Sequence, residues 1–430
     1  MAPVELVARG IVWLDGGVLR CCAIALLLTA CGGGARPGGE DGGSPGGVAL
    51  APSPETPDLP LAGASLEQQR AFRAGDAVFE QAFQPADGLG PVYVRPSCTA
   101  CHLRGGRGPA QTQRMAVVSS ATGAPVETLP FGALVRPLVA AGAVTPVLPP
   151  DGGLPPGAVL DVTTRLAAPV FGRAYLEAIL DSEIERVAAE QSLRTDGIHG
   201  RVNRVSFHSQ GTVDPRFPIH VAGETGLIGR FGVKARMATL DDVVADALQG
   251  DMGLTSALRP VELPNPDGLT DDLLPGVDMA DAQLSSLVGY ARLLEIPSRP
   301  SPDARGTALF ASVGCAACHV PSLLTRADWP TPQLAGIEAP VFTDLLLHDM
   351  GEGLADGQQE EGAGPRDFRT APLIGLSFLP AYLHGGRAGT LRDAILGHGS
   401  PGSEAAGSVE RFQALAAEDQ DALVAFVGTL

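Results

Sequence analysis

The chain has 430 residues and a formal net charge of −18 at pH 7. This charge argues against nucleic-acid binding, because phosphate recognition needs a positive surface. The length exceeds what one hydrophobic core usually supports, and 55 glycines and 37 prolines indicate long irregular connections, so we expect two domains with much loop.

The first 30 residues have the pattern of a bacterial lipoprotein signal peptide. Arg20 precedes the apolar run Ala23–Leu28, which is too short to cross a membrane as a helix. The segment Leu28–Cys31 reads Leu-Thr-Ala-Cys and resembles the lipobox, whose cysteine becomes the lipidated first residue of the mature protein. The alternative is a chance cysteine in an ordinary signal peptide. We predict lipidation at Cys31 and anchoring on the periplasmic side of a bacterial membrane.

A segment rich in glycine and proline, residues 31–64, follows the predicted lipidation site. Such a composition buries too little apolar surface to offset the entropy lost on ordering. We expect a disordered tether between the lipid and the folded part of the chain.

The cysteines point to the cofactor. Of seven, Cys21 and Cys22 leave with the signal peptide and Cys31 takes the lipid, so no disulfide is expected. The other four form two Cys-x-x-Cys-His motifs, in which both thiols reach one porphyrin edge and the histidine binds the iron. A redox dithiol or half a zinc site are alternatives that suit an exported chain poorly. We predict two covalently bound haem c groups, with attachment and proximal ligands at Cys98, Cys101, His102, Cys315, Cys318 and His319.

The surroundings of the two motifs repeat. An amphipathic helix beginning near Ser65 leads to the first motif, and a helix opened by residues 302–306 leads to the second. A closing helix is predicted in each half, at residues 281–290 and 418–426. We therefore expect an N-terminal domain at 65–300 and a C-terminal domain at 301–430.

The N-terminal domain is enlarged by a loop-rich insertion. Apolar segments between Gly/Pro clusters predict short strands at residues 115–119, 132–139 and 159–166. Helical spacing predicts helices at residues 171–191 and 239–249. The expected fold class is mainly α, with a little β-structure in this insertion.

The second ligand of each iron decides the function. An iron with two strong protein ligands carries electrons, whereas an open sixth position binds peroxide or oxygen. His384 and Met350 are candidates at the second haem, and His348 is a weaker one. No equally good candidate stands out for the first haem. The insertion offers residues that either line the first haem or lie in surface loops: His199, His208, His220, Arg201, Arg204 and Arg230.

Segments 229–235, 250–256, 343–351 and 383–396 carry a family resemblance. They resemble those of the bacterial di-haem oxidoreductases, some labelled thiol oxidoreductases, which are similar in turn to di-haem cytochrome c peroxidases. The chain departs from relatives at Leu383, where the cytochrome c peroxidases have methionine, and at Val233, where close relatives often have tryptophan.

The resemblance implies two cytochrome c-like domains. It implies that peroxide meets the haem on His102, while the haem on His319 passes electrons in. Cleavage of the O–O bond needs an acid–base group, and Glu177 lies in a segment that recurs in relatives. The alternative for Glu177 is a solvated helix glutamate.

We therefore expect an exported, peroxidase-like di-haem oxidoreductase. A small cytochrome c or cupredoxin would donate electrons, and hydrogen peroxide or another small oxidant would accept them. The alternatives are a pure electron-transfer di-haem cytochrome and an oxygen-dependent di-haem oxygenase that would use the same open iron.

Overall fold

The computed structural model of the chain describes residues 58–105, 111–127, 129, 132–140, 153–263, 276–301 and 303–430. The predicted signal peptide, the lipidation site and the tether up to residue 57 lie outside these ranges. Leu61 is buried, and its N–H donates to the carbonyl of Leu293 (2.8 Å), so the ordered part begins before Ser65. Among the described residues, no helix has both the length and the apolar character needed to cross a bilayer.

Two crossed helices begin and end the first half of the chain. Helix α1 (Leu66–Glu80) begins at the Ser65 cap, whose hydroxyl accepts from the N–H of Gln68, and packs against α5 (Asp281–Leu293). Glycine is required where they cross, because a Cβ on Gly75 would lie 2.2 Å from the carbonyl oxygen of Ser286. Beside this crossing, the rings of Phe79 and Tyr290 lie 4.9 Å apart.

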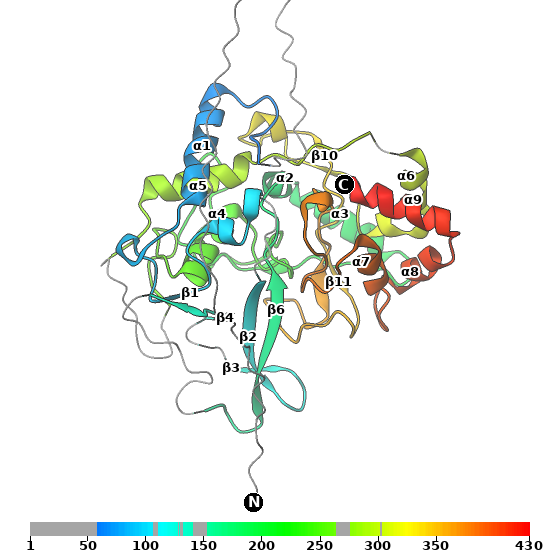
Figure 1. The fold of residues 1–430 in the computed structure, drawn as a ribbon, viewed down its shortest axis with the longest axis horizontal. Helices are drawn as coiled ribbons and strands as arrows, with labels where there is room; N and C mark the ends of the chain where they lie inside the picture. The colour runs from blue at the N-terminus through cyan, green and yellow to red at the C-terminus, as the bar shows by residue number, and fades with distance from the viewer. Residues whose placement is uncertain are drawn as a thin grey trace, which may run out of the picture. The chain divides into compact units, whose positions relative to one another are not determined.

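The second half contains an equivalent pair. Helix α6 (Ala304–Val313) begins at the Asp303 cap and packs against α9 (Ala417–Gly428). A Cβ on Gly306 would lie 2.3 Å from the Cβ of Phe426, and the rings of Phe310 and Phe426 lie 5.5 Å apart. Figure 1 shows both pairs, α1 with α5 and α6 with α9. The repeat expected from the sequence is therefore present in three dimensions.

A threonine-capped helix also occurs in each half. Helix α4 (Leu240–Ala247) follows Thr239, whose hydroxyl accepts from the N–H three residues on, and α7 (Leu391–Gly397) follows Thr390 in the same way. Before each helix the chain makes an isolated antiparallel bridge, Phe231 with Met237 and Tyr382 with Ala388. The two bridges and the two caps have the same spacing, so these segments are copies of one local structure.

The insertion contributes a small antiparallel sheet. Strand β2 (Gln111–Ser119) pairs antiparallel with β6 (Ala158–Leu166) along its whole length, and β3 (Pro125–Glu127) and β4 (Leu134–Val135) also pair with β2. Of the three predicted strand segments, 115–119 and 159–166 fall within β2 and β6. The predicted segment 132–139 is split between β4 and β5 (Leu138–Val139).

The helix predicted at residues 171–191 is divided in two, α2 (Arg173–Ala178) and α3 (Asp181–Ser192). The break has a tertiary cause. Ile179 forms an antiparallel bridge with Thr325, and the N–H of Leu180 donates to the carbonyl of Leu324 (3.1 Å).

The remaining elements are short, and helix exceeds strand among the described residues, as expected. They are β1 (Val92–Tyr93), β7 (Arg204–Val205), β8 (Leu227–Ile228), β9 (Leu323–Leu324), β10 (Glu338–Ala339), β11 (Leu347–Asp349), β12 (Asp367–Arg369) and α8 (Ala406–Gln413).

The largest hydrophobic core joins the two predicted domains. It contains Leu176 and Tyr290 from the first half and Leu334 and Leu346 from the second. A separate core cluster, which includes Phe310 and Phe426, lies within the second half. The described residues from 58 onward belong to one compact unit, and the domain boundary near residue 300 stays a prediction.

Candidate functional site: two histidine-lined cavities

The second Cys-x-x-Cys-His motif follows α6 directly. Gly314 ends the helix at φ +94°, and Cys315–Ala317 then forms a turn of 3₁₀ helix. The N–H of His319 donates to the carbonyl of Cys315 (2.9 Å), and its Nδ1 lies 3.1 Å from the carbonyl oxygen of Phe342. Because a carbonyl can only accept, Nδ1 carries the proton and Nε2 keeps its lone pair. Burial lowers the pKa of His319 to about 4, so the ring is neutral, the form that binds a metal.

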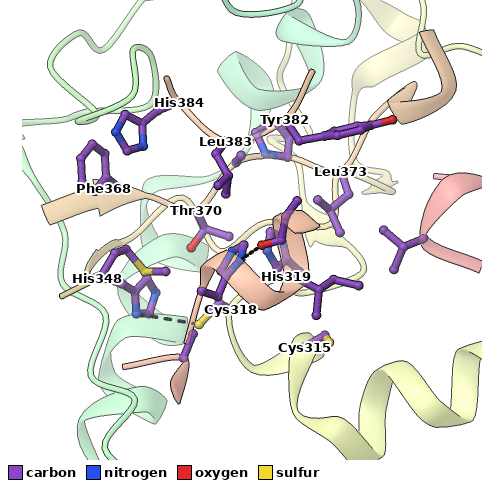
Figure 2. Close-up of a pocket in the computed structure, with 18 of the residues that line it drawn as sticks. Cys315, Cys318, His319, His348, Phe368, Thr370, Leu373, Tyr382, Leu383 and His384 are labelled. Carbon is purple, nitrogen blue, oxygen red and sulfur yellow. Dashed lines mark hydrogen bonds between the residues drawn. The ribbon is translucent and has the colours of Figure 1, made fainter. Parts of the chain in front are cut away.

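A cavity of about 260 Å³ opens beside this motif. Cys315, Cys318 and His319 line it, together with apolar residues such as Leu373 and Leu383 (Figure 2). Burial raises the pKa of Cys315 to about 11, so this thiol is neutral. Both cysteines and the histidine thus face one space enclosed mainly by apolar side chains.

A second neutral histidine lines the same cavity. His398 ends α7, and its Nδ1 lies 2.7 Å from the carbonyl oxygen of Ala394, so that Nε2 again keeps its lone pair. Burial lowers the pKa of His398, and proximity to His398 contributes to the lowered pKa of His319. The sequence analysis missed His398. The signal that could have found it is the repeated threonine-capped helix, at whose end it stands.

The two distal candidates predicted from the sequence, His384 and Met350, line this cavity too. The ring of His384 stacks on Phe368 at 4.0 Å, and its buried Nε2 makes no hydrogen bond within the described part of the chain. Figure 2 shows His384 beside Phe368 and away from His319. His398 has a hydrogen bond at Nδ1 and an electrostatic effect on the pKa of His319. Neither His384 nor Met350 has both features.

His348 cannot serve as a ligand in the form that its neighbours impose. Its Nε2 lies 2.9 Å from Asp344 and its Nδ1 lies 2.6 Å from Glu404, so carboxylates engage both ring nitrogens. Burial acts to lower the pKa of His348, but Asp344 and the Cys318 sulfur outweigh burial and raise it well above the ordinary value. The adjacent Cys318 sulfur, 3.8 Å away, belongs to a thiol whose pKa burial raises. A cationic imidazole and a neutral thiol make this cluster of Cys318, Asp344 and His348 a poor metal site.

The first motif lines a smaller cavity of about 160 Å³. Cys98–Ala100 forms the same 3₁₀ turn, and the N–H of His102 donates to the carbonyl of Cys98 (2.8 Å). Burial raises the pKa of Cys98 to about 12 and that of Cys101 to about 11. These neutral, buried thiols share one cavity with His102, as their counterparts do in the second half.

The two threonine-capped helices line the two cavities with equivalent positions. The first, fourth, fifth and eighth residues after the capping threonine face the cavity in each half. At the eighth position the second cavity has His398 and the first has Ala247. Among the described residues that line the first cavity, His102 is the only histidine, while Met252 supplies a thioether sulfur.

The first cavity has an acidic group that the second lacks at the equivalent place. Asp251 lines the cavity, and burial raises the pKa of its carboxyl to about 7. Its charge contributes to the raised pKa of both Cys98 and Cys101, which places it close to the motif. The sequence analysis quoted Asp251 within a family segment without giving it a role.

Comparison with known families identifies the chain. Residues 158–430 match the profile of the family described as "Di-haem oxidoreductase, putative peroxidase". The chain belongs to this family. The family expected from the sequence is thereby confirmed, and with it the binding of haem. The matched segment contains the Cys315–His319 motif, and the Cys98–His102 motif precedes it.

Among solved structures, the chain is similar to a xenon-pressurised structure of hydrazine synthase from Kuenenia stuttgartiensis. The identity is 15%, the match covers 92% of this chain and 100% of that one, and the TM-score is 0.33. No curated protein in the comparison matches the chain.

In this di-haem oxidoreductase, Glu177 lies outside both cavities. Its carboxylate accepts from Arg292 (2.8 and 2.9 Å) and from the N–H of Leu240 (2.7 Å), and Arg292 also pairs with Asp241. Glu177 is 6% exposed, so it is not a solvated helix glutamate either. Glu177 therefore has a structural role: it holds the N–H of Leu240, the first residue of α4, and Leu240 lines the first cavity.

The polar residues expected around the first haem are engaged elsewhere. None of the six histidines and arginines predicted around the first haem lines either cavity. Each makes a contact of its own: His199 with Gln191, His208 with Glu361, His220 with Glu224, Arg201 with Asp367, Arg204 with Glu185 and Arg230 with Asp181.

The two cavities share part of one wall. Ala168, Pro169, Arg173 and Arg369 line both of them. The two sites are therefore separated by single side chains rather than by a layer of structure.

Proposed function

We propose that this di-haem oxidoreductase is an exported c-type enzyme that takes electrons from a small redox protein and reduces hydrogen peroxide. Two haem c groups would be attached through Cys98 and Cys101, and through Cys315 and Cys318, in two cytochrome c-like domains. His102 and His319 would be the proximal ligands. Electrons would enter at the second site, and peroxide would be reduced at the first.

The residues fit such a group. In each half two neutral, at least partly buried thiols and one histidine share a cavity, and at the second site Nε2 of a neutral His319 is available for the iron. Each histidine N–H is held by the first cysteine of its motif, so the geometry of the motif is preformed. When bound, haem supplies the redox-active iron, and an open sixth position on it supplies a binding place for peroxide.

The observation that carries the proposal is the difference at the eighth position of the two threonine-capped helices. His398 offers a second imidazole at the second site, which suits electron transfer. Ala247 offers no ligand atom at the first site and leaves room there for a small oxidant. The same scaffold would thus hold one six-coordinate iron and one five-coordinate iron.

Reduction of hydrogen peroxide to two water molecules consumes two electrons and two protons. The electrons would come from a small cytochrome c or cupredoxin, and the acidic charge of the chain suits a basic docking partner. The Asp251 carboxyl would take a proton from peroxide and return it to the departing oxygen, because it lines the first cavity and titrates near neutral pH. This role replaces the one expected for Glu177, whose oxygens are held by Arg292 and Leu240.

The test is a count of haems and of open irons in the purified, exported protein. Intact mass and absorption spectra should show two covalent haems in the native chain. They should show one each in C98A/C101A and in C315A/C318A. Spin-resonance spectra should show one low-spin and one high-spin iron, and peroxide should oxidise the reduced protein. Two low-spin irons and no reaction with peroxide would refute the enzyme proposal.

A pure electron carrier is the second candidate, and Met252 is the observation that favours it. Its side chain is 4% exposed and lines the first cavity, and a thioether is a common sixth ligand of haem c. In that case both irons would be low-spin in the wild type, and M252L would make one of them high-spin.

Export and lipid anchoring are proposed on the N-terminal sequence alone. Metabolic labelling with a fatty acid should mark the wild type and not C31S. Fractionation should place the wild type in the membrane fraction, and digestion of whole spheroplasts should show that it faces the periplasm. Labelling of C31S, or protection from protease, would refute the proposed location.

A further inference from the structure

A buried arginine stands between the two cavities. Arg369 is the last residue of β12, is 8% exposed and lines both cavities. Its strand pairs with β11, with Arg369 opposite Leu347, and its N–H donates to the carbonyl of Val233 (2.8 Å). The backbone of Arg369 is therefore held by segments from both halves of the chain.

The guanidinium of Arg369 is bonded to neutral groups. Nε donates to the carbonyl of Gly232 (3.0 Å) and Nη1 to that of Thr370 (2.9 Å). These bonds use two of the five N–H donors of a guanidinium. The remaining donors can still bind an anion.

Arg369 forms no close ion pair within the described residues, although the more distant Asp344 carboxylate acts to raise its pKa. Burial lowers its pKa to about 10, so the group stays cationic at neutral pH. Within the described residues, no carboxylate lies at ion-pair distance from it, whereas the equally buried Arg165 pairs with Asp356 at 2.5 Å. A buried cation without a close ion pair is costly, and its position suits an anion that enters with a ligand of the cavities.

We propose that Arg369 binds a propionate carboxylate of the prosthetic group in each of the two cavities and so couples the two redox sites electrostatically. The inference rests on the proposed function, because it needs a haem in each cavity. Carboxylates and guanidinium groups have matching planar geometry, and one guanidinium can serve two carboxylates. Its positive charge favours the reduced iron at both sites, since reduction removes one positive charge there.

The experiment compares R369Q with R369K in the haem-loaded, full-length protein. The readout is the reduction potential of each haem, measured by spectroelectrochemical titration. R299Q is the matched control. Arg299 is partly buried and, like Arg369, bonded to carbonyls, here those of Pro340 and Leu373; its pKa is also lowered to about 10, but it lines neither cavity.

We expect R369Q to lower the equilibrium constant for reduction about tenfold at both haems, a shift of about 59 mV each for a one-electron couple. R369K should give a smaller shift of the same sign at both, and R299Q should give no shift common to the two. If R369Q does not retain both haems, the R369K titration decides.

A shift at only one haem, or at neither, in a variant with two haems would overturn the inference and leave the proposed function intact. A wild-type protein without two haems would overturn both.

Discussion

The cavities of the two halves have the same construction and differ in the side chains that would face the iron. In both, a helix with a glycine crossing leads to the motif, and a threonine-capped helix provides four lining positions. The second cavity has His398 where the first has Ala247, and the first has Asp251 near its motif. The fold therefore places equivalent side-chain positions in the two cavities, and under the proposed function the side chain at the eighth position would decide whether the sixth position of each iron is filled or open.

Replacement of the acid in the first cavity should have the largest effect. D251N should reduce peroxide turnover about 10²- to 10⁴-fold, the usual contribution of an acid–base group. The haem content and the spin state of both irons should not change. Because the carboxylate must be ionised to accept a proton, the wild-type rate should rise as the pH rises through about 7, the pKa of Asp251. This rise should be absent in D251N.

The control for this change is E80Q, which alters an exposed carboxylate on α1. It should behave as the wild type in steady-state turnover and in its pH profile. Normal turnover in D251N would show that Asp251 is not the acid–base group, so the two cavities would not differ in that respect.

Removal of the second imidazole should convert the closed site into an open one. In H398A, the low-spin signal of one haem should be replaced by a high-spin signal, because the second cavity would lose the imidazole proposed as the sixth ligand. H384A and M350L should keep the wild-type spectrum. A high-spin conversion in H384A or M350L instead of H398A would return the ligand role to one of the residues predicted from the sequence.

Loss of the charge on Glu177 should affect stability rather than catalysis. E177Q weakens a buried pair with Arg292 but leaves Asp241 as a partner of that arginine. The free energy of unfolding should therefore fall by about 2 kcal/mol, the scale of a hydrogen bond to a charged group. Denaturant titration measures this, and turnover per folded haem should stay unchanged. A turnover loss on the scale of D251N would make Glu177 catalytic.

The smallest effect is expected for the thioether in the first cavity. M252L conserves volume and apolar character, so it should cost less than about 1.5 kcal/mol. If the first iron is open, its spectrum should not change. If M252L changed one iron from low spin to high spin, Met252 would be the sixth ligand of the first haem. Both irons would then have two protein ligands in the wild type, which favours the pure electron carrier.

Much of the framework could be predicted from the sequence, because its signals are local. The apolar spacing after Ser65 predicted α1, and helical spacing at residues 239–249 predicted α4. The division between α2 and α3 could not be predicted, since it depends on a bridge between Ile179 and Thr325.

The site residues were harder to predict for the same reason. The Cys-x-x-Cys-His motifs are contiguous, so they could be recognised in the sequence. A sixth ligand can be recognised only from its position beside the proximal histidine in the folded chain. His384 and Met350 were plausible by distance along the chain, but the bond from His398 to Ala394 and its proximity to His319 appear only in the folded chain. Glu177 was predicted as the acid–base group, with a solvated helix glutamate as the alternative, and neither prediction could include the bond from Arg292, more than a hundred residues away.

The eighth position of the threonine-capped helix has an evolutionary consequence. Two copies of one unit differ there by a single side chain, alanine in one and histidine in the other. A duplicated electron carrier could therefore acquire a reactive partner by one substitution, without any rebuilding of its helices. The reverse substitution, A247H, would return the chain to two carriers joined in tandem.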